Sequence, residues 1–453
     1  MAKYQAYAEY KDSGAEWLGS IPKHWSVEYS KWLFEERNIK ANVGDEMLTA
    51  SQKYGVIPQK MFMELEQQKV VQVQLGHEIL KRAEVNDFVI SMRSFQGGIE
   101  YCGYKGAVSS AYVPLKPRQD LSISYYKYLF KSIPYIQALQ TTTNLVRDGQ
   151  ALRFANFIQV RIPLLPYSEA EKIGQFLDHE TAKIDHLIEK QQQLIELLKE
   201  KSQAVISHAV TKGLNPNVPM KDSGVEWLGE VPEHWQVGRI KHLAQIISKG
   251  TTPTTMGGDF VEEGIRFLKA ENIGKGFRVN NYPEFFISEK VDEQLARSRL
   301  KEHDVLVIIA GATTGLASVL QKELLPANTN QAVSFIRLLN FNYSHWVSHW
   351  LTTQFAQSVI WMGAVQAAQP NLSMESLGNI YIAIPPVEEV IEILKDIEFK
   401  LESFESLINK TQQQISLMQE RRTALISAAV TGKIDVRNWQ APTVAEADTE
   451  LSA

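Results

Sequence analysis

The sequence predicts a mixed α/β protein of the α+β class, in which two globular domains are joined by two long helices that pair as an antiparallel coiled coil. Three observations predict this fold. A motif of fifteen residues occurs twice, each copy precedes a body of mixed strands and helices, and each body is followed by a long amphipathic segment. The two bodies show no convincing alignment with each other. One scaffold is therefore present twice and displays two different surfaces.

The duplicated motif, called here the opening motif, covers residues 11–25 and 221–235, with eleven of fifteen positions identical at an offset of 210. Chance does not produce such a match. A second set of matches, at an offset of 220, closes each body and continues into the amphipathic segment. Its clearest members are Leu152 with Leu372, Ile162 with Ile382, Pro166 with Pro386, Leu187 with Leu407, and the stretch from Ile206 to Thr211 with that from Ile426 to Thr431.

Residues 169–211 and 388–431 are predicted to be long helices, because apolar residues recur three and four positions apart. Gly213 and Gly432 follow the last apolar residues and are natural stops. Stripes of this length need a partner, so we expect the two helices to pair antiparallel about a pseudo-twofold axis. The alternative is that each helix packs on its own domain. The residues expected in the pairing are Leu187, Leu194, Leu198, Val205, Leu407, Ile415, Met418 and Leu425.

Polar residues interrupt both apolar stripes at equivalent sites. Such interruptions can fix the register of a helical pair at some cost in stability. They are Gln191 and Thr411, and Ser202 and Arg422.

The bodies are predicted to contain buried strands at 87–92 and 304–309, each of which follows polar, turn-forming residues. A short polar tail closes the chain and is expected to be disordered. The predicted division is a first globular domain at 1–165, a first long helix at 166–214, a second globular domain at 215–386, a second long helix at 387–437, and the tail at 438–453.

Composition and motif content exclude several classes of site. No stretch approaches the ~20 apolar residues that span a bilayer, and Cys102, the only cysteine, cannot form an internal disulfide, which favours the cytoplasm. We find no phosphate-binding glycine loop, no methyltransferase tetrapeptide and no nuclease motif. His345 and His349 have the spacing of a zinc-binding helix, but Trp346 stands where the catalytic glutamate would be. We therefore expect a binding protein without metal, cofactor or catalytic residues.

The opening motif, with Asp12-Ser13-Gly14, Glu16-Trp17-Leu18-Gly19 and His24-Trp25 in its first copy, resembles that of type I restriction-modification specificity subunits. The segments that close each body, including Ile162-Pro163 and Ile384-Pro385-Pro386, resemble the same family. The resemblance covers nearly the whole chain. It implies two domains that each read one half of a split, asymmetric double-stranded DNA sequence, and a helical pair that spaces them. It also implies two modification (methyltransferase) subunits and motor-nuclease (restriction) subunits as partners, with AdoMet bound only by the partner.

The helical pair has a suitable length for this role. Residues 178–210 as a helix would rise roughly 50 Å at about 1.5 Å per residue, which suits half-sites separated by about one turn of DNA or somewhat more.

Base contacts need Arg, Lys, Asn, Gln, Ser or Thr on loops that can enter a groove. The candidates in the first body follow the predicted strand or lie in later polar stretches: Arg93, Ser94, Gln96, Lys105, Ser109, Ser110, Tyr112, Asn144, Arg147 and Arg153. Those in the second body flank glycines and strand ends: Lys249, Thr251, Thr252, Thr254, Thr313, Thr314, Asn328, Asn330 and Gln331. Many such residues instead satisfy the backbone of their own loop. Asp12, Trp17, Trp25 and their copies are interpreted as a packed corner, with partner docking as the alternative.

Two other functions stay open from the sequence. The chain could be a scaffold whose two bodies bind proteins rather than DNA. It could also be the recognition half of a methyltransferase whose catalytic domain is supplied elsewhere.

Overall fold

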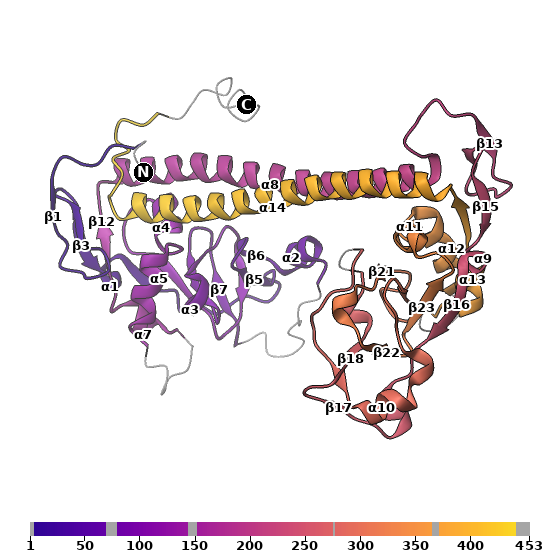
Figure 1. Cartoon of the computed structure of the whole chain (residues 1–453). Coiled ribbons are helices and arrows are strands. Elements are labelled where there is room, and N and C mark those ends of the chain that lie inside the picture. The colour runs from indigo at the N-terminus through magenta and orange to yellow at the C-terminus, as the bar shows by residue number, and fades with distance from the viewer. Residues whose placement is uncertain (1–3, 69–78, 144–151, 275–276, 365–370, 441–453) are drawn as a thin grey trace. The chain divides into compact units, whose positions relative to one another are not determined.

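The structure, a computed structural model, describes residues 4–68, 79–143, 152–274, 277–364 and 371–440. The chain divides into two compact units (Figure 1). Unit 1 comprises residues 1–192 and 412–453, and unit 2 comprises residues 193–411. Each unit therefore holds one body, the beginning of one long helix and the end of the other. This division cuts both helices, whereas the sequence assigned each helix to a segment of its own.

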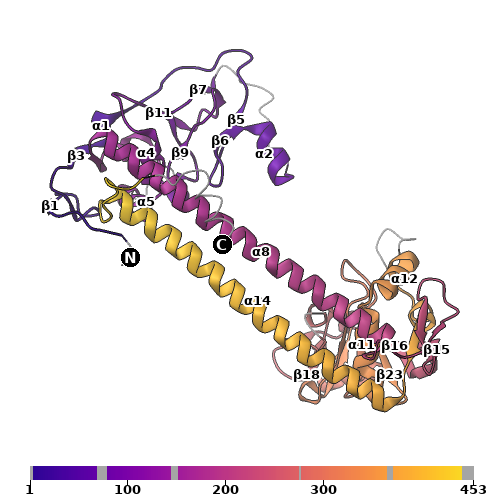
Figure 2. The same cartoon turned by 90° about the horizontal axis from the view of Figure 1, so that it is seen from above.

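The two long helices are α8 (Tyr167–Lys212) and α14 (Val387–Val430). Within each unit they run side by side in opposite directions, as Figure 2 shows. In unit 1 the pairing includes a salt bridge from Arg422 to Asp185, at 2.8 and 3.0 Å. Gly213 and Gly432 follow the helix ends with φ of +75° and +72°, a conformation that glycine adopts without steric cost and that terminates helices. The antiparallel coiled-coil pairing is confirmed within each unit.

The seam of each helix follows a heptad pattern, with alternating steps of four and three residues. Every seam position is buried or half-buried: Ile184, Ile188, Gln191, Ile195, Leu198, Ser202, Val205 and Ala209 in α8, and Phe404, Ile408, Thr411, Ile415, Met418, Arg422, Leu425 and Ala429 in α14. The predicted polar interruptions thus lie in the seam. Leu187, Leu194 and Leu407 do not, since they are 40%, 42% and 48% exposed. That part of the prediction is wrong because a position just before a seam residue lies on the flank of the helix.

The body of unit 1 is built on an antiparallel sheet in the order β4-β11-β8-β9. β8 has the all-apolar sequence Phe-Val-Ile and is fully buried, as its β-branched and aromatic composition predicts. Helices α4 and α5, with the residue that follows α4, bring four fully buried aromatic rings into the same core, those of Tyr125, Tyr126, Phe130 and Tyr135. The elements of this body are β1 (Tyr10–Asp12), β2 (Ser20–Pro22), β3 (Ser26–Tyr29), α1 (Ser30–Leu33), β4 (Phe34–Glu36), β5 (Leu48–Ser51), β6 (Gly55–Pro58), α2 (Gln59–Glu66), β7 (Lys81–Ala83), β8 (Phe88–Ile90), α3 (Ser94–Gly97), β9 (Glu100–Tyr101), β10 (Gly106–Val108), β11 (Val113–Pro117), α4 (Ile123–Leu129), α5 (Ile133–Gln140), α7 (Phe154–Phe157) and β12 (Arg161–Leu164).

The body of unit 2 repeats this plan, with a sheet in the order β16-β23-β20-β21. Its elements are β13 (Met220–Asp222), β14 (Glu230–Pro232), β15 (Gln236–Arg239), α9 (Ile240–Leu243), β16 (Ala244–Lys249), η2 (Pro253–Met256), β17 (Phe260–Val261), β18 (Ile265–Leu268), η3 (Ala270–Asn272), β19 (Phe286–Ile287), α10 (Glu289–Gln294), η4 (Ala296–Ser298), β20 (Val305–Ile308), β21 (Ala317–Val319), η5 (Lys322–Leu324), β22 (Ala327–Thr329), β23 (Val333–Leu338), η6 (Phe341–Tyr343), α11 (Ser344–Leu351), α12 (Gln354–Ala364), α13 (Met374–Asn379) and β24 (Tyr381–Ile384).

The two bodies share a framework that their sequences conceal. In both, the last strand before the long helix pairs with the strand after the opening motif, β12 with β3 and β24 with β15. The two bodies differ mainly in the chain segment between β4 and β8 in unit 1 and between β16 and β20 in unit 2. Unit 1 places β5, β6, α2 and β7 there, whereas unit 2 places β17, β18, β19 and α10 there. The divergent sequence is therefore an insertion into a common sheet.

Candidate nucleic-acid interface

One edge of the shared sheet collects loops that are far apart in the sequence. In unit 2, β16 and β20 both run antiparallel to β23, so the ends of β16 and β20 meet the beginning of β23. The backbone of Thr251 donates to the Thr329 carbonyl at 3.1 Å, and that of Ile309 donates to the Ala332 carbonyl at 2.8 Å. The Thr252 hydroxyl donates to the side-chain oxygen of Gln331. The predicted residues Thr251, Thr252, Asn330 and Gln331 thus lie together.

Unit 1 has the corresponding edge, where β4 and β8 end and β11 begins. The loop from Arg93 to Gln96 follows β8, and the turn from Ser109 to Tyr112 precedes β11. Arg93 and Tyr112 lie close enough to interact: burial raises the pKa of the Tyr112 hydroxyl, and the positive charge of Arg93 opposes that rise. Of the predicted contact residues at this edge, Arg93, Gln96 and Ser110 are exposed.

A buried ion pair supports the sheet in each unit. Asp87, immediately before β8, accepts two hydrogen bonds from Arg37 at 2.6 and 2.8 Å. Asp304, immediately before β20, accepts two from Arg337 at 2.9 and 2.7 Å. Burial raises the pKa of Asp304, and Arg337 counteracts that effect. Both aspartates are 1% exposed, so these paired charges hold the sheet in place and are not available to a ligand.

Three of the predicted contact residues are buried and make hydrogen bonds within their own unit. The Ser94 hydroxyl accepts from the Ser91 backbone at 2.8 Å. The Thr314 hydroxyl donates to the Gly311 carbonyl at 2.8 Å. Asn328 donates to Asp292 and to the Leu295 carbonyl at 3.0 and 3.1 Å. As corrections to the predicted site, these three residues are part of the loop framework, because their polar groups already have partners.

The remaining predicted residues are spread more widely. Lys105 lies 4.0 Å from Glu84, between β9 and β10, and not in the candidate loops after β8 and before β11. Arg153 is exposed just before α7, and Thr254 is exposed in the short 3-10 helix η2. Lys249 is the last residue of β16, and Thr313 lies in the loop after β20. Asn144 and Arg147 fall outside the described residues.

Sequence reasoning missed Gln52, an exposed residue of the turn between β5 and β6 whose side chain packs directly against Gly97 of the candidate loop. Nothing in the sequence signals this contact, because Gln52 belongs to the insertion that differs between the bodies. The backbone oxygen of Gln52 also accepts from Lys131 at 3.2 Å.

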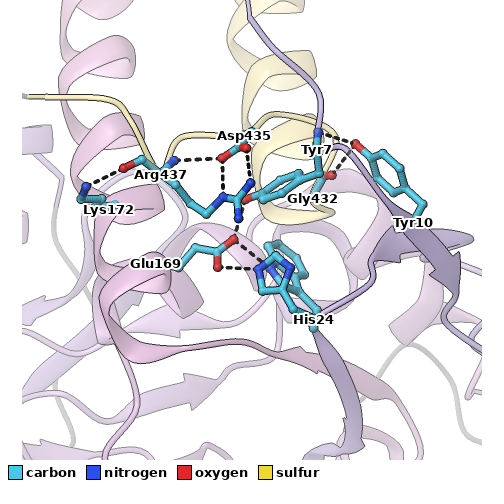
Figure 3. A network of polar contacts seen from close by, with 9 residues as sticks. Tyr7, Tyr10, His24, Glu169, Lys172, Gly432, Asp435 and Arg437 are labelled. Atoms are coloured by element: carbon cyan, nitrogen blue, oxygen red, sulfur yellow. Dashed lines mark hydrogen bonds and ion pairs between the residues drawn. The ribbon is translucent and has the colours of Figure 1, made fainter.

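The opening motif forms a packed corner on the first turn of a long helix in both units. In unit 1 the carboxylate of Glu169 accepts from Tyr7 at 2.7 Å and from Trp25 at 2.9 Å, and it lies 2.7 Å from the His24 ring (Figure 3). Burial and the neighbouring carboxylate raise the pKa of Tyr7. In unit 2 Glu389 contacts His234 and Trp235 at 2.7 and 3.0 Å.

Residues that follow α14 complete the corner of unit 1. Tyr10 donates to the Gly432 carbonyl at 3.1 Å and Lys172 to that of Arg437, while Arg437 pairs with Asp435 (Figure 3). In each unit a lysine at the end of a long helix also donates to a backbone carbonyl of the second strand in the opening motif. Lys433 donates to Ser20 of β2, and Lys212 donates to Glu230 of β14. The same corner therefore joins each opening motif to the start of one long helix and the end of the other.

Within the described ranges, no group of His, Cys, Asp and Glu side chains is arranged to hold a metal ion. His349 is 5% exposed, and burial lowers its pKa to about 3. The imidazole is therefore neutral and packs against Phe277 at 3.8 Å between ring centroids. None of the helices in the described part of the chain combines the length and the apolar character that crossing a membrane requires.

Comparisons with known proteins concern both sequence and fold. A family model described as the type I restriction modification DNA specificity domain matches residues 232–417. The chain is 22% identical over 365 residues to the type I restriction enzyme EcoBI specificity subunit of Escherichia coli, which covers 78% of this chain and 75% of that protein. It is 23% identical over 363 residues to the type I restriction enzyme MjaVIII specificity subunit of Methanocaldococcus jannaschii, which covers 78% and 80%.

Two solved structures have a similar fold. A chain from a structure of the type I R-M system superposes with a TM-score of 0.67 at 13% identity, covering 91% of this chain and 99% of that one. The HsdS subunit from Thermoanaerobacter tengcongensis gives a TM-score of 0.52 at 13% identity, covering 91% and 98%.

Proposed function

We propose that this chain binds an asymmetric, bipartite DNA target, and that each unit reads one half of it. As a member of the type I restriction-modification specificity subunits, the chain is a non-catalytic recognition component. The observation that carries this proposal is the shared sheet edge. Both units present the loops of the same three strands there, but with different residues: Arg93, Gln96 and Ser110 in one, and Thr251, Thr252 and Gln331 in the other. One framework with two sets of hydrogen-bonding side chains is suited to two different half-sequences.

The long helices would set the spacing between the half-sites. The two corners, which are alike, would give two modification subunits equivalent docking positions, and motor-nuclease subunits would join them for restriction. Methylation would then take place in the partner, at adenines positioned by this chain. A chain with this role would work in the cytoplasm.

The test is to co-express the chain with its modification subunit and to map methylated adenines across the host genome. We expect one motif with two unlike halves and an unread spacer. Two substitutions assign the halves: Arg93→Ala should relax only one half and Gln331→Ala only the other, since each good base contact discriminates by about 1–3 kcal/mol. Lys190→Ala is the charge control in unit 1, because Lys190 is an exposed residue of α8 outside this edge, and it should leave both halves unchanged.

A single continuous motif, or both substitutions affecting the same half, would contradict the proposal. Enrichment of no sequence from a random DNA pool, together with unchanged protein assembly, would instead identify a protein-binding scaffold.

A further inference from the structure

A cavity of about 440 Å³ opens beside the first opening motif, entirely within unit 1. Its walls include Trp17 of the motif, Pro134 and Ala138 of α5, and Arg161 of β12. Tyr135, which is fully buried, contacts Trp17 edge-on at 5.8 Å between ring centroids. Trp17 nevertheless lines the open space. The cavity volume lies within the range of about 300–1,000 Å³ that is usual for ligand sites.

The corresponding place in unit 2 contains an aromatic ring of the chain itself. Ser132 and Thr353 precede helices α5 and α12, and each hydroxyl donates to the carbonyl three residues earlier at 2.7 Å. This shared bond aligns the two helices, so that Pro134 corresponds to Phe355. Phe355 stacks on Trp227, the second copy of Trp17, with ring centroids 6.1 Å apart and an interplanar angle of 30°. The unit 1 cavity therefore lies where unit 2 provides a phenyl ring.

The surface around the cavity has the composition of a protein-binding site. The Arg161 guanidinium is 5.7 Å from the ring centroid of Tyr29, and its Nε is buried without a hydrogen-bond partner. Tyr29 and Trp32 are 45% and 63% exposed. Trp, Tyr and Arg are the residues that dominate the energetic centres of protein interfaces. The corresponding surface of unit 2 has Arg239 and His242 at the positions of Tyr29 and Trp32.

We propose that the cavity receives an aromatic side chain of a partner polypeptide, which stacks on Trp17 as Phe355 stacks on Trp227. Unit 2 does not offer this site because Phe355 fills it. The corners themselves stay alike in their hydrogen bonds, and unit 1 has beside its corner an additional contact site that unit 2 lacks. The cavity lining contains none of the sheet-edge residues that are proposed to contact DNA, although Gln140 of α5 donates to the Phe95 carbonyl of that edge at 2.7 Å.

The experiment places the photo-crosslinking residue p-benzoylphenylalanine at Gln137, an exposed residue of the cavity wall, in the full chain within its complex purified from cells. We expect an adduct on a partner polypeptide, mapped by mass spectrometry to within a few residues of an aromatic side chain. Replacing that aromatic residue by alanine should weaken the complex at least about tenfold, as expected for an interface anchor.

Two substitutions provide matched controls. Pro134→Phe transfers the unit 2 ring into the cavity and should abolish the adduct, while Phe355→Ala should leave it unchanged. The unfolding midpoint and DNA affinity of Pro134→Phe should match those of the unaltered chain, which separates failure of this proposal from failure of DNA recognition. Indole titrated onto the isolated chain tests a free aromatic molecule as the occupant. Indole binding without a polypeptide adduct, an adduct on this chain itself, no adduct at all, or an adduct that survives Pro134→Phe would overturn the proposal.

Discussion

Glu169 and Glu389 hold equivalent positions in the first turns of α8 and α14, where a carboxylate also interacts favourably with the helix dipole. Their surroundings differ, because the Glu169 side chain is 6% exposed and that of Glu389 is 28% exposed. Water can replace a lost acceptor more easily at the second site. The cost of removing each carboxylate therefore depends on burial as well as on the number of donors.

We expect Glu169→Ala to lower the free energy of unfolding by about 3 kcal/mol and Glu389→Ala by about 1 kcal/mol, since donors stranded in a buried site bear the full desolvation penalty. Urea denaturation of the full chain, followed by tryptophan fluorescence, measures both. Equal losses would show that neither the deeper burial of Glu169 nor its additional hydrogen bond from Tyr7 strengthens the corner of unit 1.

Glu100 gives unit 1 a pH dependence. Burial raises its pKa to about 7 even though Lys131 lies 2.8 Å away and opposes the rise. A carboxyl whose pKa is raised by folding stabilises the folded chain below the unfolded pKa, and this contribution is lost as pH rises to about 7.

Glu100→Gln should therefore become more stable relative to the unaltered chain as the pH rises from about 5 to about 8. Thermal unfolding midpoints across this range provide the measurement. Lys131→Met removes the ammonium that limits the rise in the pKa of Glu100. The loss of stability with rising pH should therefore be larger in this variant. A difference between Glu100→Gln and the unaltered chain that stays constant with pH would exclude this role of Glu100.

At the scale of elements, the long helices were predictable and the shared sheet was not. A heptad pattern is local, and it placed Leu198, Ile415 and Leu425 in the seam from spacing alone. The strands β4, β8, β9 and β11 are short, and their pairing joins segments that are distant in the chain, so no local pattern records it. Strands β8 and β20 could be recognised only because both are continuously apolar.

The candidate site was predictable to a similar degree. The position of Arg93 after a strand indicated an exposed loop. The sequence could not show that Ser94 and Asn328 are buried, since the same residue types serve both as hydrogen-bond partners of the loop backbone and as ligand contacts.

The seam prediction can be tested with two neighbouring residues of α8. Ile195 is 7% exposed and Leu197 is 61% exposed. Ile195→Ala should lower the free energy of unfolding by about 2–4 kcal/mol, and Leu197→Ala by less than about 0.5 kcal/mol. Both residues lie in the middle of α8 and have nearly the same side-chain volume. Similar losses for the two substitutions would therefore contradict the assignment of the seam.

At the scale of the whole molecule, the proposed spacing role predicts a quantitative change in the DNA target. Inserting one heptad into each long helix preserves the seam and adds roughly 10 Å of helix at 1.5 Å per residue. At about 3.4 Å per base pair, the unread spacer should lengthen by about three base pairs while both half-sequences stay the same. Methylation mapping of the doubly inserted chain measures this, and insertion into one helix alone should abolish binding. A spacer of unaltered length would refute the spacing role.

Unit 1 is assembled from both ends of the described chain, whereas unit 2 is one continuous stretch. The Asp435 amide donates to the Gln5 carbonyl, and Trp439 packs edge-on against Phe176 at 5.6 Å between ring centroids. During synthesis, unit 2 can finish its core while the first body still lacks the residues that seal it. The half of the protein that leaves the ribosome first is thus the last to mature, and it exposes unsealed apolar surface to chaperones and proteases for nearly the whole time of translation.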